Sequence, residues 1–224
     1  AGKSTLVKTI SGVLTADEGQ IFVDEAPVAI SSPQMASHLG IETVYQDLAL
    51  CDNLDVVANL FLGHELRTRV GFMNEAKMEE QSLAVLRSLN VKLPSTRTPV
   101  SALSGGQRQS IAVAKTILRQ AKVVLLDEPT AALGVAQTHQ VLQLIKRLRE
   151  QGLGVVVISH NMVDVFEVAD RIIVMRLGQR VATFGTEYTN SNQVIAAITG
   201  AEFGDNEKAQ QMIGKNNFGG NGNE

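Results

Sequence analysis

The feature that most constrains the fold is an unbroken apolar run at residues 123–126, which ends in Asp127 and Glu128. A short apolar run without polar alternation is typical of a strand that is buried on both faces, as in a parallel sheet. Such a strand needs helices on both sides, so the chain is predicted to fold as an α/β protein. The two acidic residues then lie at the rim of the sheet.

Composition narrows the class of protein. The chain has 224 residues and 24.1 kDa, enough for one large domain or two small ones. No apolar stretch approaches the roughly 20 residues that a membrane-spanning helix needs. A net charge of -3 and a pI near 5.9 argue against a nucleic-acid partner. The single cysteine, Cys51, excludes an internal disulfide framework.

Hydrophobic periodicity and turn residues predict alternating strands and helices. A helical insertion is expected from residue 48 to about 89, and a disordered, Gly- and Asn-rich tail over residues 201–224. The predicted strands are 20–24, 41–45, 123–127, 154–159, 172–175 and 180–182, and the predicted helices outside the insertion are 3–10, 33–38, about 105–119, 135–150 and 192–198.

Two segments have the residue types that bind phosphate. Gly2, Lys3, Ser4 and Thr5 form the back half of a P-loop pattern, in which the lysine reaches the terminal phosphates and the hydroxyl holds magnesium. The same string also occurs as an ordinary turn that opens a helix. Because the chain begins inside this pattern, we interpret it as a fragment, truncated within the motif.

The second segment is residues 103–107, Leu-Ser-Gly-Gly-Gln, at the start of a predicted helix. Gly105 and Gly106 let the backbone approach a polyanion, Ser104 adds a hydroxyl donor, and the helix directs its positive end to the same place. This segment therefore predicts half of a shared ATP site.

Polar residues at strand ends predict the catalytic groups. Asp127 can bind Mg²⁺ directly or through water, and Glu128 can polarise the water that attacks the terminal phosphorus. His160 follows the apolar strand before it and can orient that water, while Gln46 can contact the magnesium or the water. The alternative for Asp127 and Glu128 is a strand end that breaks into a turn and needs no ligand.

Together these motifs resemble the nucleotide-binding domain of an ABC transporter. The resemblance covers nearly the whole chain, and its motifs occur in the family's order: Walker A at Gly2, Lys3, Ser4 and Thr5, the Q-loop Gln46, the signature Ser104, Gly105, Gly106 and Gln107, Walker B with Asp127 and Glu128, and the switch His160. It implies a P-loop NTPase (RecA-like) core, residues 1–46 and 119–200, with an α-helical subdomain at 47–118. It also implies ATP and Mg²⁺ as ligands.

In that family the domains dimerise head to tail, so a second copy of the chain would complete each ATP site. The resemblance further implies a separate membrane permease, an indirect partnership with a periplasmic sugar-binding protein, no nucleic acid, and a peripheral location on the cytoplasmic face of the inner membrane. Residues 131–134 (Ala-Ala-Leu-Gly) and 42–46 are similar to ATPases of bacterial sugar importers of the ribose, xylose and fructose type. Gly134 stands where the family usually has aspartate, which puts cross-subunit coupling in question.

Two other functions stay open. The chain could be an ABC ATPase of translation or repair that has no membrane partner, although those usually carry two cassettes or a long coiled insertion. It could also be a catalytically weak interaction module, since the front of the phosphate loop is missing. As an ATPase too, this fragment is expected to be weakly active or inactive, whereas a version extended at the N-terminus is expected to hydrolyse ATP.

Overall fold

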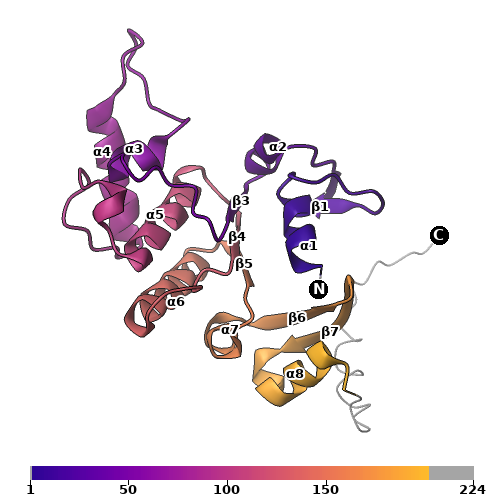
Figure 1. The fold of residues 1–224 in the computed structure, drawn as a ribbon. Coiled ribbons are helices and arrows are strands. Elements are labelled where there is room, and N and C mark those ends of the chain that lie inside the picture. The colour runs from indigo at the N-terminus through magenta and orange to yellow at the C-terminus, as the bar shows by residue number, and fades with distance from the viewer. Residues whose placement is uncertain (1, 202–224) are drawn as a thin grey trace. The chain divides into compact units, whose positions relative to one another are not determined.

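The structure is a computed structural model that describes residues 2–201. These residues form two compact units, 2–169 and 170–201, which are described separately. The tail predicted for residues 201–224 lies outside the described residues, apart from residue 201. The first unit contains α1 (Lys3–Ile10), β1 (Ile21–Val23), β2 (Ala26–Val28), α2 (Pro33–His38), β3 (Ile41–Val44), α3 (Val56–Phe61), α4 (Glu75–Ser88), η1 (Val100–Ala102), α5 (Gly105–Leu118), β4 (Val123–Asp127), α6 (Val135–Glu150), β5 (Gly154–Ile158) and α7 (Met162–Val168), shown in Figure 1.

A three-stranded parallel sheet in the order β3-β4-β5 lies at the centre of this unit. Side chains of β4 alternate between the two faces, as the pleat of a strand requires. Val124 and Leu126 belong to a large apolar cluster formed with α3, α4, α5 and α6, whereas Leu125 packs in a smaller cluster with Val7 of α1 and Ile158 of β5. The predicted α/β class and the strand buried on both faces are confirmed.

The predicted helical insertion is less continuous than its sequence pattern. Only α3 and α4 are helical between residues 48 and 89, and a long connection separates them. Leu60 and Phe61 of α3 are buried in the core, as apolar residues at helical spacing usually are. Leu83, Leu86 and Leu89 are at helical spacing in the sequence. Leu86 and Leu89 are buried, but Leu83 is exposed.

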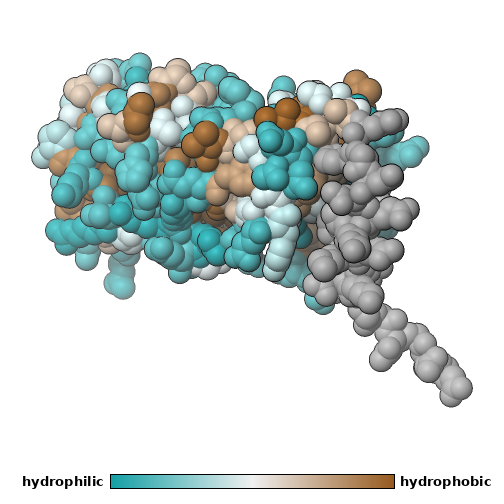
Figure 2. All heavy atoms as spheres, turned by 90° about the horizontal axis from the view of Figure 1, so that it is seen from below, coloured by the Kyte–Doolittle hydropathy of each residue, from teal (hydrophilic) through white to brown (hydrophobic). Residues whose placement is uncertain are grey.

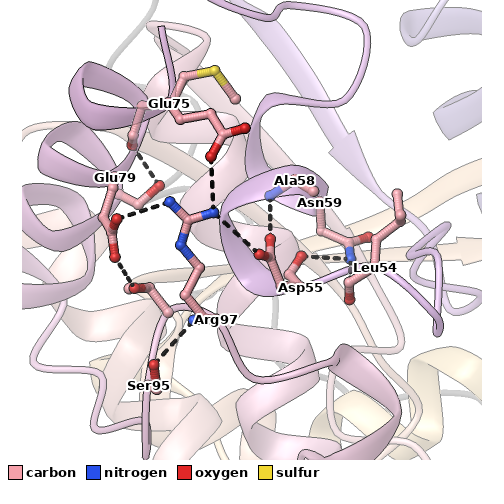
Figure 3. A network of polar contacts seen from close by, with 11 residues as sticks. Leu54, Asp55, Ala58, Asn59, Glu75, Glu79, Ser95 and Arg97 are labelled. Atoms are coloured by element: carbon pink, nitrogen blue, oxygen red, sulfur yellow. Dashed lines mark hydrogen bonds and ion pairs between the residues drawn. The ribbon is translucent and has the colours of Figure 1, made fainter. Parts of the chain in front are cut away.

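An arginine holds the two helices of this region together (Figure 3). The Arg97 guanidinium lies 2.9 Å from Glu79 and 3.4 Å from Glu75 on α4, and 3.5 Å from Asp55. Asp55 caps α3 by accepting a hydrogen bond from the Ala58 N–H at 2.7 Å. One side chain from the connection before η1 therefore fixes the start of α3 against the first turns of α4.

The second unit is built from one antiparallel strand pair and a helix. Its elements are β6 (Arg171–Arg176), β7 (Gln179–Gly185), the single turn η2 (Thr186–Tyr188) and α8 (Ser191–Thr199). The turn between the strands contains Leu177 and Gly178, both with positive φ. This agrees with the two strands and the closing helix expected from the sequence.

Figure 2 shows a face on which hydrophilic residues predominate and apolar residues form small, separate groups. Within residues 2–201, no helix is both long enough and apolar enough to cross a bilayer.

Candidate functional site

The candidate site is built on the carboxyl ends of the three parallel strands. Gln46 lies just after β3, Glu128 just after β4 and His160 just after β5. In the sheet register Val44 is paired with Leu126, and Asp127 with Ile158, so all three strands end at the same edge. Parallel α/β sheets bind ligands at this edge, because the loops that leave it converge there.

Glu128 has an unusual backbone that sets the direction of its side chain. Its φ is 49°, in the left-handed region that residues other than glycine seldom adopt. Its N–H donates to the Ile158 carbonyl at 2.8 Å, which continues the pairing of β4 with β5 for one residue beyond the strand. Its carboxylate lies 2.9 Å from Nδ1 of His160.

These two side chains differ in exposure. The Glu128 side chain is 19% exposed and that of His160 is 77% exposed. The carboxylate is thus largely shielded from water, whereas most of the imidazole is exposed to solvent. The sequence predicted both residues as site members, and the structure brings them into direct contact.

A cleft of about 270 Å³ joins two of the predicted strand-end residues to the signature segment. Gln46, Glu128 and Gly105 all line it. The other lining residues are Asp47, Leu48, Leu50, Arg108, Gln109, Pro129, Ala131 and Leu133. The first turn of α5 and the ends of β3 and β4 therefore face one space.

Ser104 is the N-cap of α5. Its Oγ accepts the Gln107 N–H at 3.3 Å, and Gln107 Oε1 accepts the Ser104 N–H at 3.0 Å, which completes a capping box. The Ser104 hydroxyl keeps its own proton for another acceptor. Gln107 is held further by a hydrogen bond to the Lys92 carbonyl at 3.1 Å.

The paired glycines have a packing role that sequence reasoning did not foresee. A Cβ on Gly105 would lie 2.8 Å from Cδ2 of Leu133, and one on Gly106 would lie 3.2 Å from Oε1 of Gln140. Both distances are tighter than ordinary contact, so the glycines let α5 approach α6 and the loop before it. Gly105 stays partly exposed at the helix start, whereas Gly106 is buried.

The P-loop residues start α1. Gly2 is the N-cap with a φ of 90°, and Lys3 begins the helix, with Ser4 and Thr5 exposed in its first turn. Among residues 2–201, no hydrogen bond or ion pair is recorded between this segment and Asp127 or Glu128. The structure therefore brings Gln46, Gly105, Glu128 and His160 together, but it does not join Lys3 or Ser4 to them.

Several residues near the site had no predicted role. Arg108 lines the cleft and pairs with Asp52 at 2.6 Å, and its position directly after the signature was the available signal. Thr130 donates to the buried Asp164 at 2.6 Å, which ties the loop after β4 to α7. Nothing in the local sequence pairs these two residues, which are 34 positions apart.

Gly134 is the N-cap of α6, with φ −72° and ψ 163°. These are values that any residue can adopt, and a Cβ there would meet nothing within 4 Å. The aspartate that the resemblance implies at this position is thus compatible with the backbone.

Comparison with known proteins identifies the family. The model of the ABC transporter family matches residues 1–131. The chain is 43% identical over 204 residues to the xylose/arabinose import ATP-binding protein XylG of Sulfolobus acidocaldarius, covering 91% of this chain and 81% of that protein. It is 45% identical over 210 residues to the fructose import ATP-binding protein FrcA of Rhizobium meliloti, covering 90% and 80%.

The fold agrees with a solved cassette. The dimeric post-hydrolysis structure of the ATP-binding cassette MJ0796 with ADP and Pi superposes with a TM-score of 0.67 at 25% identity, covering 83% of this chain and 81% of that one. This likeness confirms the predicted P-loop fold. Since the family model covers more than half of the chain and two relatives match nearly all of it, this protein belongs to the ABC transporter family, among its ATP-binding ATPases.

Proposed function

We propose that this protein hydrolyses ATP at a dimer interface and thereby drives the import of a sugar through a separate membrane permease. The observation that carries the proposal is the Glu128 carboxylate, which leaves the end of β4 beside a cleft shared with Gln46 and Gly105, 2.9 Å from His160. The sugar is inferred from the relatives, which are named for xylose/arabinose and fructose import.

Phosphoryl transfer to water needs a group that orients and polarises the attacking water. In the proposed reaction, Glu128 accepts a hydrogen bond from this water and takes its proton as the water oxygen attacks the terminal phosphorus of ATP. The bond from that phosphorus to the bridging oxygen breaks, and ADP leaves with this oxygen. His160 keeps the carboxylate in place and approaches the terminal phosphate from the exposed side. Gln46 contacts the water from the end of β3.

In this proposal, the N-termini of α1 and α5 bind the phosphates. Lys3 reaches the terminal phosphates, and the N–H groups of Gly2, Lys3, Ser4 and Thr5 surround the others at the positive end of α1. From the start of α5, the Ser104 hydroxyl and the N–H groups of Gly105 and Gly106 offer the same kind of donors to the ATP of a second copy. Gln107 holds Ser104 in position through the capping box.

The side chains are compatible with Mg²⁺. The expected ligands are the Ser4 hydroxyl and the Asp127 carboxylate, with Gln46 as an additional oxygen ligand. Among residues 2–201, no group of three or more His, Cys, Asp or Glu side chains could hold a metal ion. Mg²⁺ is usually held by one or two protein oxygens together with substrate phosphates and water. Bound there, the ion would neutralise charge on the transferred phosphoryl group.

The partners follow from the shared site. A head-to-tail dimer would give each ATP one P-loop and one signature segment. A permease would receive the conformational change through the helical subdomain, residues 47–118, while residues 1–46 and 119–200 form the nucleotide-binding core. The dimer would then work peripherally on the cytoplasmic face of the membrane, and a sugar-binding protein would deliver the solute on the other side.

The test is Glu128→Gln in the full-length protein together with its permease. We expect turnover to fall by about 10²- to 10⁴-fold, because the water loses its base while Asp127 and the phosphate donors persist. ATP binding should be retained. Glu150→Gln, at the exposed end of α6, is the matched control and should hydrolyse ATP normally.

Two results would contradict the proposal. Undiminished hydrolysis by Glu128→Gln would remove Glu128 from the reaction. Negligible turnover by the unmodified protein with Mg-ATP and permease would favour an interaction module instead. The solute is tested by uptake of xylose, arabinose and fructose into vesicles that contain the permease, and failure with every sugar would refute sugar import alone.

A further inference from the structure

The connection between α3 and α4 forms an ordered hairpin over residues 66–74. Arg67 and Met73 form an antiparallel bridge. The Thr68 N–H donates to the Phe72 carbonyl at 2.7 Å, and the Asn74 N–H to the Leu66 carbonyl at the same distance. Figure 1 shows this connection projecting well beyond both helices.

The tip of the hairpin carries apolar side chains that contact little else. Val70 is 78% exposed, Phe72 74% and Met73 55%. Single exposed apolar residues are ordinary on a protein surface, but three within four positions on a projecting turn are not. Gly71, with a φ of 90°, makes the tight turn between them and adds no side chain of its own.

The charge of the same hairpin is positive. Arg67 and Arg69 are exposed, and no acidic residue lies between positions 66 and 74. The acidic neighbours on either side already have partners. Glu65 accepts the Gly63 N–H at 2.9 Å, and Glu75 pairs with Arg97. This local excess of positive charge contrasts with the net charge of -3 of the whole chain.

We propose that the 66–74 hairpin inserts its tip into the interface of an anionic lipid bilayer. Val70, Phe72 and Met73 would enter the boundary between headgroups and acyl chains, while Arg67 and Arg69 extend to lipid phosphates. A projecting tip with apolar residues beside arginines suits a soft, negatively charged surface, and the net negative charge of the rest of the chain disfavours general adsorption to one. The contact belongs to this chain itself and does not depend on its ATPase activity or on a permease.

The experiment is flotation of the purified full-length protein with lipid vesicles, without permease or nucleotide. Vesicles of phosphatidylcholine alone are compared with vesicles that contain about one-third phosphatidylglycerol, and we expect binding to the second kind only. The double variant R67Q/R69Q should bind about 25-fold more weakly, at roughly fivefold for each arginine. V70S/F72S should lose binding by about tenfold or more.

Matched controls remove the same groups elsewhere on the surface. R87Q/K92Q deletes two exposed positive charges near the other end of α4, and F22S deletes an exposed aromatic on β1. Both should bind anionic vesicles as the unmodified protein does. Equal losses in the controls and the hairpin variants would overturn the proposal, because binding would then not be localised.

A fluorescent reporter tests insertion directly, because the chain contains no tryptophan. F72W should shift its emission to the blue and be quenched by brominated lipids on addition of anionic vesicles, whereas F22W should do neither. An unshifted F72W would overturn the proposal. So would hairpin variants that bind vesicles normally but fail to assemble with the permease, since the occupant of this surface would then be a protein.

Discussion

At the scale of single residues, the backbone decides what Glu128 can do. A φ of 49° costs about 1 kcal/mol or more for a residue with a side chain, and it persists because the Glu128 N–H is bonded to Ile158. The turn directs the carboxylate away from the line of β4 and toward His160. The sequence could supply the residue and its position after a buried strand, but not this conformation.

Gly12 offers a residue-scale prediction. It has a φ of 73°, and a Cβ there would overlap the Ser32 carbonyl, so Gly12→Ala should lower the free energy of unfolding by about 3 kcal/mol. Gly19→Ala is the control, because Gly19 has a φ of 96° but nothing within 4 Å, and it should cost only about 1 kcal/mol. Urea unfolding measures both, and equal losses would show that the contact with Ser32 is unimportant.

The position of Gly12 also links stability to the site. The preceding residue, Ser11, accepts a hydrogen bond from the Tyr45 hydroxyl at 2.9 Å, and Tyr45 immediately precedes Gln46. A shift of the chain at Gly12 would therefore reach the end of β3.

At the scale of elements, α3 and α4 are joined by charge as well as by apolar packing. The Arg97 guanidinium hydrogen-bonds Glu79 and thereby lowers the pKa of that carboxyl from its ordinary value of 4.5. Thr96 adds a second hydrogen bond to Glu79 at 2.8 Å, which acts in the same direction. A carboxyl whose pKa is lower in the folded than in the unfolded protein stabilises the fold at every pH above its pKa in the unfolded protein. This stabilisation is lost as the pH falls through the pKa of the carboxyl in the folded protein.

Arg97→Gln should therefore destabilise the protein in a pH-dependent way. At pH 7 its melting temperature should lie below that of the unmodified protein by at most about 3 °C, since these groups are solvent-exposed and screened. The difference should begin to shrink as the pH falls below about 4.5, and it should vanish once the pH has fallen through the lowered pKa of folded Glu79, where this carboxyl is protonated in both proteins. Thermal melts across this range provide the measurement. Lys92→Gln is the control, and a difference for Arg97→Gln that persists at low pH would assign its effect to packing.

Elements with a clear hydrophobic periodicity could be predicted from the sequence, whereas elements that depend on turn geometry could not. The bounds of β4 and α6 follow from an apolar run and a clear helical stripe. Strand β1 was predicted, but β2 and its pairing in a hairpin were missed, because Asp24 and Glu25 both have positive φ without the Asn-Gly or Asp-Gly pair that usually marks such a turn. Helix α7 was missed as well, although Asn161 caps it by accepting the Val163 N–H.

The candidate site, too, could be predicted only in part from the sequence. The order of its motifs along the chain predicted that Gln46, Glu128 and His160 would follow three strands. Their meeting at one edge needs the β3-β4-β5 order, which brings together strands that are distant in sequence. The packing of Gly105 against Leu133 needs the three-dimensional approach of α5 to the loop before α6, and no local pattern encodes it.

At the scale of the whole molecule, the proposed ATP site needs residues from two copies of the chain. Gly105 at the start of α5 lines a cleft with Glu128 and Gln46, but Lys3 and Ser4 do not line that cleft. Within the described residues, the two segments that we propose to bind phosphate are thus not joined into one site. A second copy that lends its signature segment would complete the site, and its ATP would hold the two copies together.

Complementation between two inactive variants can test this arrangement. Lys3→Ala removes the phosphate lysine, and Ser104→Asp repels phosphate but keeps the N-cap of α5, because aspartate caps as well as serine. Each variant alone should be inactive. A mixed head-to-tail dimer would contain one doubly damaged site and one intact site. Random pairing in an equal mixture should therefore restore about a quarter of normal ATPase activity. Ser104→Asn, a neutral cap, should retain more activity than Ser104→Asp. If each site lay within a single chain, no mixture of the two inactive variants could hydrolyse ATP, and the shared site would be refuted.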